Sequence, residues 1–259
     1  MKTADLILRL TAHDLRCRCL GSMLGFAWSF VQPFVMTVIL WFVFALVANA
    51  NAMRGVPFVA WLLAGMSVWS FFSEALSQAT SVFCEYAFMA RKVNFQLAVL
   101  PLVKIFAALA VHLVFLLIVA VVLLLNHVAI SWSWPAVAYY LFATVALLAG
   151  LSYITASMHV FLRDVGQMVN VALQFGFWIT PVFWDFGMPP LQAHPVLVFI
   201  LRLNPVVYLV EGYRNSLLFD APFAAGLWET IYFWAVTAAI AAAGSLIFRK
   251  LRPQFADVL

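Results

Sequence analysis

The chain has 259 residues, of which 66% are hydrophobic and only 9% are charged. Soluble domains carry about 25% charged residues, so this chain cannot cover a globular surface with polar groups and needs lipid as the solvent for its apolar excess. The formal net charge of +4 comes from basic residues that stand between apolar runs and form no single patch. This distribution argues against a nucleic-acid-binding protein and is typical of a membrane protein, in which basic residues report topology.

The apolar runs predict an all-α membrane protein with six transmembrane helices. A span needs about 20 apolar residues. The runs lie at about 26–48, 58–83, 100–125, 136–160, 165–183 and 227–248. The fifth run is shorter and more polar than the others. No repeat or linker divides the chain, so residues 1–259 are expected to form a single domain.

Two further segments are predicted to be helical without crossing the membrane. In residues 1–22, Leu6, Ile7, Leu10 and Leu15 recur at helical spacing among charged residues, which indicates an amphipathic helix in the membrane interface. The segment 186–220 is apolar but interrupted by prolines, and its runs are too short to span. It is expected to form two short re-entrant helices, or else a pair of amphipathic helices on the outer surface.

The basic residues predict the orientation. If both termini are cytoplasmic, eleven of the 14 Lys and Arg residues fall on the cytoplasmic side and only Arg54, Arg202 and Arg214 fall outside. This excess follows the positive-inside rule. The even number of predicted spans agrees with it.

Motifs for catalysis are missing from the sequence. It contains no nucleotide-binding G-x-x-x-x-G-K-[S/T], no H-E-x-x-H and no G-x-S-x-G. The acids of the outer region, Asp185, Glu211, Asp220 and Glu229, show no spacing typical of a catalytic pair, and no metal site is expected. Glu74 lies inside the second predicted span on one helical face with several serines, which suits either a functional acid or a polar packing face.

Two helical faces are candidates for lining a conduit. In the fifth run, Gln167, Asn170, Gln174 and Trp178 share one face, and in the first run Phe30, Phe34 and Trp41 do so. Amides in a bilayer need partners or water. Aromatic rings stack on sugars and amides bond to hydroxyls, so the two faces together suit a glycan. The alternative is that the aromatic residues face lipid or another helix.

The predicted cytoplasmic loop at 84–96 combines charges with aromatic side chains. Its candidate contact residues are Glu85, Tyr86, Phe88, Arg91, Lys92 and Phe95. Exposed apolar groups usually mark a contact surface, so a cytoplasmic protein partner is one interpretation. Anchoring in the membrane interface is the other.

Several strings, in this order and topology, resemble ABC type-2 permeases that export polysaccharide, foremost those of O-antigen or teichoic acid. They are Leu24-Gly25-Phe26-Ala27-Trp28 with Gln32-Pro33, Arg91-Lys92-Val93-Asn94-Phe95 with Leu100-Pro101, Phe161-Leu162-Arg163-Asp164-Val165-Gly166-Gln167 with Phe177-Trp178-Ile179-Thr180-Pro181-Val182-Phe183-Trp184, and Asn204-Pro205 with Glu211-Gly212-Tyr213-Arg214. The resemblance covers nearly the whole chain and places it in the bacterial inner membrane.

The resemblance implies a mechanism and a set of partners. Two copies of the chain would pair around a conduit above two cytoplasmic ABC ATPase chains, which would bind the ATP and Mg, so this chain needs no cofactor. The segment 84–96 would be the coupling helix region and 186–220 the periplasmic gate region. The substrate would be a polysaccharide on undecaprenyl diphosphate, and Arg16 and Arg18 at the cytoplasmic rim are candidates to hold the diphosphate.

Other functions share some of these features. A capsule exporter, or a type-2 permease for a small molecule or drug, would have the same fold. A membrane-embedded glycan-modifying enzyme would need clustered acids or bases at one membrane face. A passive channel would work without any ATPase.

Overall fold

The protein is described by a computed structural model that covers residues 3–19, 27–47, 52–90, 96–128, 131–221, 223 and 226–258. It is mostly helical, with one two-stranded antiparallel hairpin. The longer helices are α1 (Thr3–Cys19), α2 (Trp28–Trp41), α3 (Phe58–Thr80), α6 (Leu100–Leu125), α7 (Ala136–Phe161), α8 (Asp164–Ile179), α10 (Pro195–Arg202), α11 (Pro205–Leu218) and α12 (Leu227–Leu251). The short elements are η2 (Phe42–Val47), β1 (Ala52–Met53), β2 (Val56–Pro57), α4 (Val82–Glu85), α5 (Ala87–Ala90), η3 (Leu97–Val99), α9 (Pro189–Gln192), η4 (Arg252–Gln254) and α13 (Phe255–Val258).

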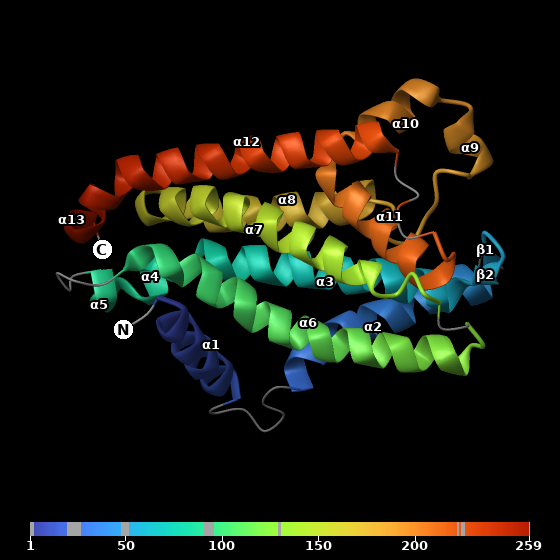
Figure 1. Ribbon diagram of the computed structural model, residues 1–259, viewed down its shortest axis with the longest axis horizontal. Helices are drawn as coiled ribbons and strands as arrows, with labels where there is room; N and C mark the ends of the chain where they lie inside the picture. Colours follow the sequence, from blue (N-terminus) through green and yellow to red (C-terminus); the bar gives the residue numbers. More distant parts are fainter. Residues whose placement is uncertain are drawn as a thin grey trace.

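Helix α3 forms the centre of the bundle. It contacts α2, α6, α7, α8 and α11, and most of its side chains are buried, including Trp61 and Phe58. In Figure 1 it runs between α6 and the α7–α8 pair, while α12 lies alongside α7 on the far side. Its first nine residues, 58–66, include no polar side chain, which is typical of a helix enclosed by other helices.

The elements separate toward two ends of the bundle. Helices α1, α4, α5 and α13 and both chain termini lie at one end, and the hairpin β1–β2 lies with α9 and α10 at the other (Figure 1). At the first end, Phe83, Phe248 and Phe255 stack together and fix α13 beneath the bundle.

Four described helices are long and apolar enough to cross a membrane. They are Phe58–Thr80, Leu97–Leu125, Ala136–Phe161 and Leu227–Gln254, which confirms the second, third, fourth and sixth predicted runs as helices of spanning length. Counting the bent pair α10–α11 as one span would raise the number to five. The first and fifth runs are shorter as helices than expected, because α2 continues into a π-helix and α8 has only 16 residues.

The break in the proline-rich segment has a local cause. Helices α10 and α11 meet at an angle of 91°, so neither continues the other. Pro205 cannot continue a preceding helix but suits the first turn of a new one, and the Asn204 side chain accepts a hydrogen bond from the amide of Val206 at 3.0 Å. Two short helices were predicted in this segment, and α10 and α11 correspond to them; the four-residue helix α9 precedes both.

Small residues allow α7 and α12 to approach closely. A Cβ atom added at Gly244 would lie 2.6 Å from the carbonyl oxygen of Gly150, and one added at Gly150 would lie 2.9 Å from the amide nitrogen of Ala241. Close backbone contact of this kind is a usual way to pack helices in membranes, where burial of apolar surface provides little drive.

We predict that Gly244→Leu destabilises the fold by about 1–3 kcal/mol, because its side chain would push α7 and α12 apart. Thermal unfolding of the purified protein in detergent measures the effect. Ala242→Leu, at an exposed position of the same helix, should leave the unfolding temperature nearly unchanged. Equal effects of the two substitutions would contradict close packing at Gly244.

Candidate functional site

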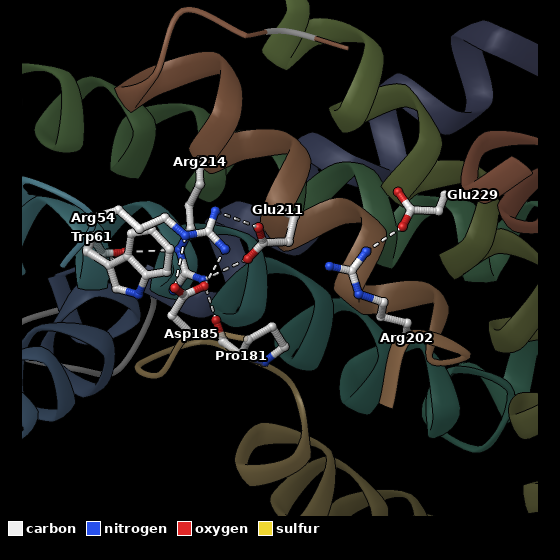
Figure 2. A network of polar contacts seen from close by, with 8 residues as sticks. All are labelled: Arg54, Trp61, Pro181, Asp185, Arg202, Glu211, Arg214 and Glu229. Carbon is white, nitrogen blue, oxygen red and sulfur yellow. Dashed lines mark hydrogen bonds and ion pairs between the residues drawn. The ribbon is translucent and has the colours of Figure 1, made fainter. Parts of the chain in front are cut away.

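Five side chains from four segments form one polar group near the hairpin, here called the arginine cluster: Arg54, Trp61, Asp185, Glu211 and Arg214. Arg54 lies in the turn of β1–β2, Trp61 in the first turns of α3, and Asp185 in the loop after α8. Glu211 and Arg214 lie one turn apart on α11. Figure 2 shows the two guanidinium groups converging on the two carboxylates beside the indole ring.

The guanidinium of Arg214 is fully buried and well satisfied. It donates to the carbonyl oxygens of Pro181 and Val182 and, at 3.4 Å, to that of Trp61. Its central carbon lies 3.8 Å from the centre of the Trp61 ring, and its Nη1 lies 3.3 Å from Oε1 of Glu211. A buried charge is tolerated only when it is paired and hydrogen-bonded, so these contacts tie α11 to α3 and to the loop after α8.

Gly65 leaves the space that Arg214 occupies. A Cβ atom at Gly65 would lie 2.7 Å from Nη2 of Arg214 and 2.7 Å from the carbonyl oxygen of Val182. Any larger residue would displace the guanidinium from the carbonyl groups that satisfy it.

Arg54 connects the hairpin to the same cluster from its exposed side. Its guanidinium bonds Asp185 through two nitrogens, with the Nε–Oδ2 bond at 2.9 Å, and its Nη1 lies 3.5 Å from Glu211. Partial burial would lower the pKa of Arg54, but the bond to Asp185 and the nearby carboxylate of Glu211 outweigh it and raise the pKa. The cluster thus joins two cations to two anions and holds four segments together.

A separate ion pair fastens α10 to α12. Arg202 donates to Glu229 at 2.5 Å, and the Tyr232 hydroxyl donates to the carbonyl oxygen of Leu203 at 2.9 Å. Figure 2 shows this pair beside the arginine cluster but without a contact to it. Both partners are largely exposed, so the pair stabilises the fold far less than the contacts of Arg214 do.

A second charged group lies at the opposite end and is here called the lysine cluster: Asp14, Glu85, Tyr86 and Lys104. Lys104 Nζ lies 2.7 Å from Asp14 of α1 and 2.7 Å from Glu85 of α4. The Tyr86 hydroxyl donates to Asp14 at 3.5 Å. Burial and the negative charge of Asp14 raise the pKa of Tyr86, so its hydroxyl keeps the proton that it donates.

The residues predicted to line a conduit occupy two helices that both pack on α3. Gln167, Asn170, Gln174 and Trp178 are all exposed on α8, and Asn170 accepts a hydrogen bond from Ser77 of α3 at 2.9 Å. On α2, Phe34 and Trp41 are exposed, whereas Phe30 packs partly against the core. A single chain therefore leaves both predicted faces largely open.

The predicted coupling residues are described in part. Phe88 is 58% exposed, Glu85 is exposed, and Tyr86 is half-buried in the lysine cluster. Arg91, Lys92 and Phe95 lie outside the described residues. Of the predicted rim residues, Arg16 is exposed on α1, and the side chain of Arg18 lies outside the described part of the chain.

Neither cluster was predicted from the sequence. The spacing of the outer acids indicates no catalytic pair, yet folding brings Asp185 and Glu211 to one guanidinium. Both acids are held by arginines, so the arrangement joins segments and does not present a free acid–base pair. The available signal was a charged residue in an apolar helix, Arg214 in α11 and Lys104 in α6, since such a charge requires a partner.

These features define a helical membrane protein whose charged residues gather at the two ends of an apolar bundle. Residues 5–218 match the family described as ABC-2 type transporter, and the chain belongs to this family. It is a membrane-integral permease subunit of a transporter and not an enzyme.

Similar proteins cover almost the whole chain. The O-antigen export system permease protein RfbA of Klebsiella pneumoniae is 26% identical over 98% of this chain and 95% of its own length. The O-antigen export system permease protein RfbA of Myxococcus xanthus is 28% identical over 97% of this chain and 94% of its own length.

We predict that Arg214→Met destabilises the protein by about 3–5 kcal/mol. It leaves the buried carbonyl oxygens of Pro181 and Val182 without their donor and leaves Glu211 with Arg54 as its cation. The yield of monodisperse protein in detergent and its thermal unfolding report the change. Arg202→Met serves as the matched control and should cost under about 1 kcal/mol, since it breaks a solvent-exposed pair. Similar losses for the two variants would show that Arg214 is not the stronger link.

Proposed function

We propose that this chain is the permease subunit of an ATP-driven exporter that moves a polysaccharide, carried on undecaprenyl diphosphate, across the bacterial inner membrane. O-antigen is the first candidate for the substrate. The observation that carries this proposal is the similarity, over nearly the full length of the chain, to permeases named for O-antigen export.

The proposed topology has six spans with both termini in the cytoplasm. The two shorter runs, α2 with η2 and α8, would complete the four long helices. Support comes from the distribution of charge and from the fold. The end of the bundle that carries both termini also holds the start of α6, with Lys104, and the junction of α7 and α8, with Arg163. Arg54 lies in the hairpin at the other end, near α10 with Arg202 and α11 with Arg214.

The proposed conduit forms between two copies of the chain. The open faces of α2 and α8 carry the aromatic and amide side chains expected to contact sugars, and Trp178 is 55% exposed. An exposed amide face toward lipid would be costly, because hydrocarbon offers no hydrogen-bond partner. Water and glycan in a conduit would satisfy Gln167 and Gln174.

The proposed partner is a pair of cytoplasmic ABC ATPases that bind the segment around α4 and α5. Phe88 belongs to α5, which lies at the end of the bundle where both termini lie, and its side chain is exposed. An exposed aromatic side chain at a helix pair outside the apolar bundle is suited to a pocket on a partner protein. ATP hydrolysis on that partner would drive the change between closed and open states.

To test the partnership, we would purify the chain together with the ABC ATPase made in the same cells. Phe88→Ala is expected to weaken the pairing about tenfold, as for a central aromatic contact. Phe199→Ala changes an equally exposed phenylalanine on α10 and should leave the pairing intact. If no ABC ATPase binds the unaltered chain, the exporter proposal fails. If Phe88→Ala pairs normally, the contact lies elsewhere.

To test the conduit, we would measure polysaccharide at the surface of cells in which the only copy of the chain carries Trp178→Ala. Export is expected to fall about tenfold while ATPase pairing persists, because loss of one stacking platform costs about 1–3 kcal/mol. Trp228→Ala removes a tryptophan that is also exposed but stands at the start of α12. Equal export by both variants would argue against a conduit along α8.

A further inference from the structure

Three segments that are far apart in the sequence meet at the ammonium group of Lys104. Asp14 belongs to the amphipathic helix α1, Glu85 ends α4, and Lys104 lies in the second turn of α6. Both carboxylates lie 2.7 Å from Nζ, which also stands 5.7 Å from the centre of the Tyr86 ring. A single cation thus connects the interface helix to the segment proposed to bind the ATPase.

The two bonds of Lys104 differ in how easily they break. The side chains of Lys104 and Asp14 are 9% and 7% exposed, so breaking their bond would weaken the pairing of two charges that water does not solvate well. Glu85 is 43% exposed, and Ser81 also donates to it at 2.5 Å. Glu85 can therefore move into water at small cost, while Asp14 stays on Lys104.

Asp14 also sets the rotation of α1 about its own axis. With Asp14 turned toward α6, the side chain at position 16 points to the opposite side of the helix, and Arg16 is accordingly exposed. Leu10 packs against the buried apolar cluster that includes Phe83, Phe248 and Phe255. Any force on α1 that passes through Lys104 therefore changes the placement of the helix that carries the proposed diphosphate-binding residues.

We propose that Lys104 is a positioning residue that passes movement of the α4–α5 segment to the interface helix α1, through a permanent bond to Asp14 and a releasable bond to Glu85. This inference rests on the proposed function, because the movement would come from the ATPase. In one state the Glu85 bond holds α1 and α4 together. In the other state the bond is broken and α1 moves independently of α4.

Hydrogen exchange of the complete complex tests this role, with and without nucleotide trapped by vanadate. In the unaltered complex, trapping is expected to change exchange both at 82–90 and at 3–19. In Glu85→Gln the response at 82–90 should persist, while the response of α1 should fall about fivefold, the size expected for losing one charge-assisted hydrogen bond. A purely structural role for Glu85 would instead shift α1 exchange equally in both states.

Two further variants complete the test. Asp5→Asn removes the exposed pair with Arg9 on the same helix and should leave the nucleotide response of α1 unchanged. Asp14→Lys combined with Lys104→Glu keeps one cation between two carboxylates and should restore the response that Lys104→Glu abolishes.

The outcomes separate the inference from the proposal beneath it. An α1 response in Glu85→Gln equal to that of the unaltered complex would overturn the link through Lys104 while leaving the exporter intact. Absence of any response at 82–90 in the unaltered complex would overturn the coupling role itself, and the inference with it.

Discussion

Arg214 places a positive charge in a region that water does not reach, and the surrounding chain is arranged around that charge. Three backbone carbonyl groups, the face of Trp61 and the carboxylate of Glu211 surround the guanidinium, and Gly65 leaves it room. These partners come from α3, from α11 and from the loop after α8. The path of the chain around α11 thus depends on satisfying one buried cation, because leaving it unsatisfied would cost several kcal/mol.

The lysine cluster solves the same physical problem at the other end of the bundle. There the cation belongs to a long apolar helix, and its anions belong to the amphipathic helix α1 and the short helix α4. Between the two clusters the bundle is held by apolar packing and by close backbone contacts such as that of Gly150 with Gly244. In lipid, unsatisfied polar groups are costly, and burial of apolar surface contributes little to the association of helices. Ion pairs at the ends and close packing in the middle therefore suit a protein that stays folded in a membrane.

Much of the fold was accessible from the pattern of the sequence. The runs at 58–83, 100–125, 136–160 and 227–248 are long helices in the structure, and the two helices expected in the proline-rich segment correspond to α10 and α11. These features depend on local chemistry, namely apolar length and the effect of proline on a helix. The fifth run was predicted to reach Phe183 but ends as α8 at Ile179, because the chain turns at Thr180 and Pro181. The carbonyl oxygens of Pro181 and Val182 then accept hydrogen bonds from Arg214.

The sequence by itself determined that this protein belongs in a membrane and where its long helices lie, since both follow from residue type and the length of the apolar runs. Only the tertiary structure decided which charges meet. Arg54 and Asp185 are 131 residues apart, and Lys104 and Asp14 are 90 apart. No local pattern encodes these pairs, because each requires helices from different parts of the chain to pack first. A charged residue within an apolar helix predicts that a partner is needed, but only the packing of the helices decides which residue is that partner.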